Sequence, residues 1–138
     1  MASIAVSRWP GNNINLNAQA QQLGSEIRRT QSLAMSRGQR FRINLSSGGY
    51  SITDSSGTNY YTDTIRGQNT INFPSDITAS WSNTVLNNNL ISFDGNGTPY
   101  TNAAASTALS STAVISLTSA GYTRTVSVSP GTGRVIVQ

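Results

Sequence analysis

Hydrophobic and polar positions follow a helical period in one part of the chain, between Asn15 and Gly38. Six residues recur there at spacings of three and four, and at about 100° per residue they fall in one narrow stripe. These residues are Leu16, Ala20, Leu23, Ile27, Thr30 and Ala34. The pattern predicts an amphipathic helix over residues 14–38, capped at its start by Asn13 or Asn15 and ended by Gly38.

The opposite side of this helix carries small polar residues. In chain order they are Ala18, Ser25, Ser32 and Ser36, with Gln21 and Gln22 between them. Small residues along one line allow another helix to approach closely, so Ser25, Ser32 and Ser36 are candidate contact residues. Serine is equally a tolerated solvent-facing residue in a helix, and both interpretations stay open.

After Gly38 the period changes to two. Apolar residues at 41, 43 and 45 alternate with polar ones at 40, 42 and 44, which predicts a half-buried strand and then a hairpin through residues 46–49. Further strands are predicted at residues 60–65, 70–73, 77–81, 90–93, 113–118, 122–129 and 134–137. About eight short strands imply two packed antiparallel sheets or one strongly curved sheet.

The length of 138 residues suits one domain. Pro10 and Gly11 separate the first residues from the helix, so we expect residues 1–13 to be a linker or the remnant of a preceding segment. Residues 14–38 are then the helix and residues 39–138 a β-body. Within that body, the small residues at 101–112 predict a flexible surface loop. No run of about 18 apolar residues and no secretory signal are present.

The amino-acid composition excludes most of the residue types that enzymes use as nucleophiles and general bases. The chain has no cysteine and no histidine, and the serines therefore lack the usual base partner. The five carboxylates are scattered, so we expect no enzyme activity, no metal site and no cofactor or small-molecule substrate. Asp94 to Gly97 is similar to the start of a calcium loop, but residues 98–106 contain no carboxylate, which favours a plain turn.

All nine cationic side chains are arginines, and the formal net charge is +4. A basic balance permits binding to nucleic acid or to an acidic surface. Only 10% of the residues are charged, however, and this is equally compatible with a mildly basic surface that has no polyanionic partner.

Four motifs in this order resemble one protein family. The helix segment LxxxIRRTQSLAMSRGQ at residues 23–39 leads directly into a strand and hairpin. Residues 90–98, LISFDGNGT, are similar to a strand followed by a glycine turn, and residues 114–128 to a penultimate hairpin. Residues 129–135, SPGTGRV, are similar to a terminal glycine-arginine strand. Together, over residues 14–138, they resemble the GspH/FimT family of minor pseudopilins and minor pilins.

The resemblance implies an α+β fold of the type IV pilin kind, with an N-terminal amphipathic helix packed on antiparallel sheets. It implies a non-catalytic structural subunit of a bacterial type IV pilus or type II secretion pseudopilus, with other pilin or pseudopilin subunits as partners. It also implies a missing hydrophobic helix ahead of Ile4 to Val6 that anchors the precursor in the inner membrane, and a periplasmic or extracellular domain.

Some members similar to FimT are DNA receptors in natural transformation, and their motif is a C-terminal Gly-Arg-x-Arg. Gly133 and Arg134 match its first half, but Ile136 stands in place of the second arginine. Arg124 on the neighbouring strand is a candidate to share a face with Arg134. A second candidate cluster joins Arg37, Arg40 and Arg42 where the helix meets the first strand. These side chains could contact double-stranded DNA through its phosphates.

Two alternatives to DNA binding stay open. The arginines could cover the sheet surface with their stems or form salt bridges in a filament. A free-standing adhesin or carbohydrate-binding domain would use aromatic side chains, but the two tryptophans and five tyrosines are spread along the chain, which favours core packing.

Overall fold

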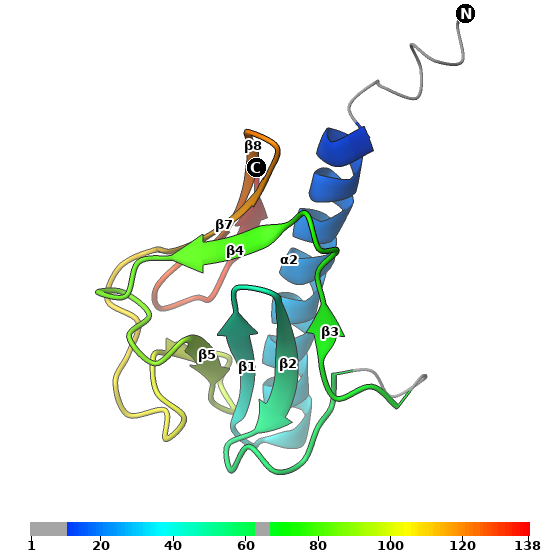
Figure 1. Cartoon of the computed structure of the whole chain (residues 1–138). Coiled ribbons are helices and arrows are strands. Elements are labelled where there is room, and N and C mark those ends of the chain that lie inside the picture. Colours follow the sequence, from blue (N-terminus) through cyan, green and yellow to red (C-terminus); the bar gives the residue numbers. More distant parts are fainter. Residues whose placement is uncertain (1–10, 63–66) are drawn as a thin grey trace, which may run out of the picture.

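The computed structural model describes residues 11–62 and 67–138 and consists of one long helix beside two antiparallel sheets (Figure 1). The helix, α2, spans Gly11–Arg37. Across the described residues, no helix combines the length and apolarity needed to cross a membrane. The expected α+β architecture is therefore present, with two separate sheets rather than one strongly curved sheet.

The helix begins three residues earlier than predicted. Asn13 and Asn15 lie inside α2 rather than at its cap, so that part of the prediction is wrong. Proline disfavours helix mainly in the residue before it, and a helix can therefore start directly after Pro10. The end is as predicted: Gly38 has φ +60°, and the Gln39 N–H donates to the Ala34 carbonyl at 3.2 Å.

The first sheet has five strands in the order β3-β2-β1-β5-β6. Their bounds are β1 Phe41–Ser46, β2 Gly49–Asp54, β3 Ile71–Asn72, β5 Leu90–Phe93 and β6 Pro99–Tyr100. In β1 the predicted alternation is confirmed, because residues 41, 43 and 45 are buried and residues 42 and 44 are half-buried on the other face. The second sheet has the order β4-β7-β8-β9. Its strands are β4 Thr78–Trp81, β7 Ala113–Ser119, β8 Tyr122–Val128 and β9 Val135–Val137.

Two tight hairpins fix the registers. Ser46 pairs with Gly49 across a two-residue turn between β1 and β2. Ser119 pairs with Tyr122 between β7 and β8, and both residues of that turn, 120 and 121, have positive φ. Positive φ at both positions produces the turn whose twist matches that of paired strands.

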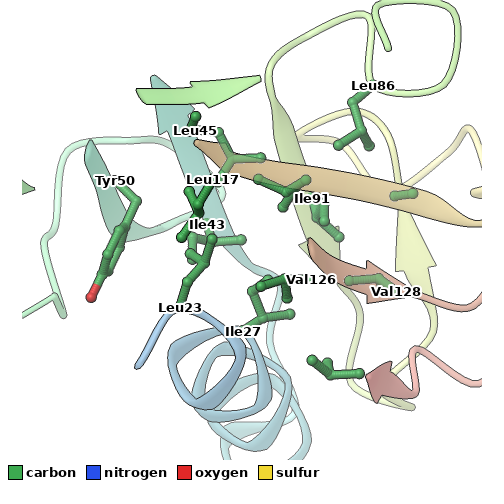
Figure 2. Close-up of a cluster of buried hydrophobic side chains, with 14 of the residues drawn as sticks. Leu23, Ile27, Ile43, Leu45, Tyr50, Leu86, Ile91, Leu117, Val126 and Val128 are labelled. Atoms are coloured by element: carbon green, nitrogen blue, oxygen red, sulfur yellow. The ribbon is translucent and has the colours of Figure 1, made fainter. Parts of the chain in front are cut away.

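The core forms where the helix meets both sheets. All six residues of the predicted apolar stripe are fully buried. Figure 2 shows Leu23 pointing toward Ile43 and Leu117, and Ile27 pointing toward Val126. One helix face therefore covers the inner sides of both sheets, which leaves the opposite helix face and the outer sheet faces for other contacts.

Two predictions need correction, one of a strand and one of a surface loop. Within the predicted strand 60–65, Tyr60 forms only an isolated bridge with Thr53, and residues 63–66 lie outside the described residues, as do residues 1–10. The surface-loop prediction for 101–112 is wrong for Thr101 and Leu109, which are buried. The Asn102 side chain organises this loop by accepting hydrogen bonds from two backbone N–H groups, those of residues 106 and 107.

Candidate interaction surfaces

The exposed side of α2 presents small uncharged side chains. Ala18, Ser25, Ser32 and Ser36 are all exposed, and they lie opposite the buried stripe. Met35 stands beside them with 54% of its surface exposed. We refer to Ala18, Ser25, Ser32 and Ser36 as the strip of small residues. The sequence predicted helix contact at this strip.

The two arginines that flank this strip turn away from it. Arg28 donates to the Val135 carbonyl at 3.1 Å, and Arg29 donates to the carbonyls of Tyr61 and Thr62. Arg29 also forms an ion pair with Glu26 at 3.2 Å, the one salt bridge within residues 11–62 and 67–138. Because both guanidinium groups donate to backbone carbonyls of the β-body, neither lies over the strip, and the strip stays uncharged.

Gln31 ties the helix to two turns of the β-body. Its Nε2 donates to the Gly97 carbonyl at 2.8 Å and to the Thr132 carbonyl at 2.9 Å. Gly133 lies directly against this amide, since a Cβ there would be 2.7 Å from the Gln31 Nε2 and 3.0 Å from a Phe93 ring carbon. With φ +68°, the glycine of the Gly-Arg motif is required by packing and backbone conformation.

The contacts of Gln31 and Arg28 were not predicted from the sequence. Both residues lie in a helix, and their acceptors are backbone carbonyls about a hundred residues away along the chain. No pattern of residue types marks a carbonyl as an acceptor. The contact of Gly24 was not predicted either, but the sequence carries a signal for it. An isolated glycine inside a helical pattern indicates close packing, here against a neighbouring strand.

Arg134 and Arg124 do not share a face, so that prediction is wrong. Val126 pairs with Val137 on the helix-facing side of the second sheet, and Arg124 alternates in step with Val126. Arg134 alternates with Val135 and therefore points to the outer side, where it is exposed. Arg124 is half-buried, and its Nε has no hydrogen-bond partner in the part of the chain that is described.

The predicted cluster of Arg37, Arg40 and Arg42 is divided among separate contacts. Arg37 lies over the Tyr61 ring, 5.2 Å from its centroid. Arg40 donates to the Ala104 carbonyl at 2.6 Å, and Arg42 donates through Nε to the Thr53 hydroxyl at 3.1 Å. Each guanidinium keeps free N–H groups, but none of the three forms an ion pair with a described carboxylate.

Two carboxylates stabilise turns near these arginines. Hydrogen bonds from the Ser56 hydroxyl and then from the Asn59 side chain lower the pKa of Asp54 to about 2. Burial raises the pKa of Asp94, but bonds from Thr98 and Tyr100 outweigh it, and the resulting pKa lies below its usual value. The oxygens of both carboxylates accept hydrogen bonds within their own turns. Among the described residues, no group of three side chains could hold a metal ion.

A shallow hollow of about 380 Å³ lies between these turns and the end of α2. It is lined by Gly38, Gln39, Arg40, Asp54, Ser55 and Gly95. The hollow holds one cation and one carboxylate whose oxygens are already bonded, so its charge favours neither an anion nor a cation.

Comparisons with known proteins give one family model and two crystal structures of similar fold. The family described as "Type II transport protein GspH" matches residues 19–132. A crystal structure of the Pseudomonas aeruginosa (strain PAO1) type IV minor pilin FimU is 18% identical, with a TM-score of 0.63 over 92% of this chain and 90% of that chain. A second crystal form of FimU is 19% identical, with a TM-score of 0.61 over 89% and 92%. No curated protein sequence matches this chain.

Proposed function

Because this chain belongs to the GspH family of type II transport proteins, we propose that it is a minor pilin or pseudopilin. In this role it is a non-catalytic structural subunit in the assembly of a bacterial type IV pilus or a type II secretion pseudopilus. The similarity of its fold to FimU supports a place in a pilus, and the family description supports a place in a secretion pseudopilus.

The single observation that carries this function is the two-sided character of α2. One side of the helix is fully buried against both sheets, while the other side presents exposed Ser25, Ser32 and Ser36. Small side chains on an exposed helix let a neighbouring element approach closely without displacing bulky groups. We therefore assign this strip of small residues to contacts with neighbouring pilin or pseudopilin subunits.

The proposal includes a membrane-anchored precursor in the bacterial envelope. A hydrophobic helix ahead of this chain would hold the domain at the periplasmic face of the inner membrane until it enters a filament. In Figure 1, the first residues of α2 lie at one end of the domain, level with the β7–β8 hairpin.

Tryptophan substitutions on the strip test this function. Ser25→Trp and Ser32→Trp, introduced into the precursor in the bacterium that encodes it, should reduce filament assembly or secretion about tenfold. The reason is that forcing a bulky side chain into a packed contact costs about 1–3 kcal/mol. Ser110→Trp, at an exposed position in the loop before β7, is the matched control. Normal assembly by both strip variants would refute the proposed contact.

DNA binding is the second candidate function, and the exposure of Arg134 supports it. This guanidinium forms no ion pair with a described carboxylate, and Gly133 holds its backbone against α2. A free, exposed arginine of this kind can contact a phosphate of double-stranded DNA. The family motif calls for a second arginine at the position of Ile136, so any such site must recruit its other cations from elsewhere.

A further inference from the structure

The strand β9 forms an edge of the second sheet. It stands at the end of the strand order and pairs with β8. Thr125 and Gln138 exchange both backbone hydrogen bonds, at 3.0 and 2.9 Å, and the Ser129 N–H donates to the Arg134 carbonyl at 2.9 Å. Because bonded pairs alternate along an antiparallel ladder, every second residue from 134 to 138 turns its backbone groups toward β8. The residues between them turn theirs to the outside of the sheet.

Val135 and Val137 are these outward-turned residues. The Val135 carbonyl accepts a hydrogen bond from the Arg28 Nη2 at 3.1 Å. The N–H groups of both valines and the Val137 carbonyl have no hydrogen-bond partner among the described residues. The helix does not cover them, because Gly24 packs on the valine side chains at the inner face of the sheet. A sheet edge with free donors and acceptors is a template for another extended chain.

Two arginines flank this open edge, one on each side. Arg28 reaches Val135 from α2, on the inner side, whereas Arg134 points to the outer side. Both residues are exposed, and neither forms an ion pair, since the salt bridge found within residues 11–62 and 67–138 joins Arg29 to Glu26. Guanidinium groups on both sides of the edge favour a strand that carries carboxylates on both of its faces.

The register of β9 predicts the residue pattern of an added antiparallel strand. Opposed residues of paired strands share a face, so the residue opposite Val135 would point to Arg28 and the residue opposite Arg134 to the outer side beside it. The other two positions lie opposite Val137, which is half-buried, and Ile136, an exposed apolar residue. In its own chain direction, the added strand would therefore carry two apolar residues followed by two acidic residues.

We propose that the open edge of β9 receives an extended segment of this pattern from a different polypeptide, a neighbouring subunit in the filament. A second copy of this chain does not fit, because no two of its five carboxylate residues are adjacent. Nucleic acid could neutralise the arginines, but its backbone has no N–H groups for the outward carbonyls. The inference rests on the proposed function, which supplies the neighbouring subunit.

A short edge predicts a weak contact for a free peptide. The added strand gains a few backbone hydrogen bonds and two exposed ion pairs, each of which contributes little in water. We therefore expect a dissociation constant of about 1 mM for the isolated segment. In a filament, where other contacts hold the subunits together, the same segment acts at a higher effective concentration.

A synthetic peptide tests the proposal by NMR on the whole isotope-labelled chain. The probe is acetyl-Thr-Val-Ile-Glu-Glu-Thr-amide, added to about 5 mM so that a millimolar site approaches saturation. The amide protons of Val135 and Val137 should shift downfield with saturation and exchange severalfold more slowly, because they gain acceptors. The Ile136 amide, which already faces β8, should shift less.

Two control peptides separate strand pairing from attraction by charge. The first has N-methyl groups on the valine and the first glutamate, the two residues whose N–H groups would face β9. It keeps both charges but should not bind. The second has glutamine in place of both glutamates and should bind at least fivefold more weakly. Equal binding by the N-methylated peptide, or no shift of the Val135 and Val137 amides at 5 mM probe, would overturn the proposal.

A substitution in the protein makes the result specific. Arg28→Gln should weaken binding of the acidic probe about fivefold, while the glutamine peptide should be unaffected by this change. Arg40→Gln, which removes the same charge at an exposed residue beside the other sheet, is the matched control. Urea unfolding of both variants verifies that each is folded. Equal weakening by the two variants would also overturn the proposal, because it would indicate attraction to net charge alone.

The peptide result is independent of filament assembly in cells. Strand pairing at β9 together with normal assembly by the Ser25→Trp and Ser32→Trp variants would refute the proposed contact through the strip and leave the edge site. Impaired assembly by those variants without peptide binding would refute the edge site alone.

Discussion

Gly24 of α2 faces Val137 of β9 so closely that a Cβ on the glycine would lie 2.6 Å from the Val137 Cγ2. Real Cβ atoms do not approach other carbon atoms to that distance, because van der Waals contact between carbons begins near 3.5 Å. A side chain at this point of the helix would therefore push the last strand outward. Val135 and Val126 are also within 4 Å of the same position.

Gly24→Ala should destabilise the domain although alanine is the better helix former. Removing a glycine from a helix interior gains about 1 kcal/mol. Overpacking costs typically about 1–3 kcal/mol, and we expect a net loss of about 1 kcal/mol in the free energy of unfolding by urea. In a Val137→Ala background the clash is absent, so the same substitution should stabilise. An unchanged sign in both backgrounds would contradict this account of the contact.

Most of the fold was predictable from local patterns. The buried stripe of α2 follows from its period, the strand β1 from its alternation, and the hairpin at residues 46–49 from its turn residues. The start of α2 was not predictable, because Asn13, Asn15 and Gly11 are all acceptable first residues. Burial of Leu109 was missed because a run of small residues hides one apolar contact that only the tertiary structure creates.

Gln31 should contribute to stability through its two long-range hydrogen bonds. Gln31→Ala leaves the carbonyls of Gly97 and Thr132 without this donor, and a lost hydrogen bond costs about 0.5–1.5 kcal/mol. We expect a decrease of about 1–3 kcal/mol in the free energy of unfolding, with faster amide exchange in residues 129–134. Gln22→Ala, an exposed position on the same helix, is the control and should change stability little.

The pH dependence of stability should follow Asp54. Its pKa is lowered to about 2, first by the Ser56 hydroxyl and then by the Asn59 side chain, from an ordinary value of 3.8. The unfolded chain therefore binds the proton more readily, and the stabilisation is present above about pH 4 and is lost as the pH falls toward 2. Urea midpoints measured from pH 6 to pH 2 should fall less steeply for Asp54→Asn than for the natural chain.

Ser56→Ala checks the cause of that effect. Without the serine hydroxyl, the pKa of Asp54, followed by NMR, should rise toward 3.8. A pKa that stays near 2 in this variant would assign the effect to the other bonds of the turn.

Candidate site residues were less predictable than the fold, because a strand with an unbroken apolar run shows no alternation, and its faces are decided only by how it pairs. Arg124 lies in β8 and Arg134 directly precedes β9, and their positions relative to the Val126–Val137 pair place them on opposite faces. All three residues of β9 are apolar, so the residue types alone do not assign Arg134 to a face, whereas the pairing of Val126 with Val137 does. The exposure of Ser25, Ser32 and Ser36, by contrast, follows directly from the angle between them and the buried stripe.

The opposite placement of Arg124 and Arg134 makes DNA binding testable by its salt dependence. Each phosphate contact on double-stranded DNA contributes about 0.9 to the slope of log affinity against log salt. As a structural subunit, the chain should bind labelled DNA only weakly at low salt. Arg134→Ala and Arg124→Ala should then change the affinity and its salt slope by the same small amount. A DNA receptor that uses the outer face would lose about one unit of slope with Arg134→Ala and none with Arg124→Ala. An Arg40→Ala/Arg42→Ala variant with a larger loss than either would place the site on β1 instead.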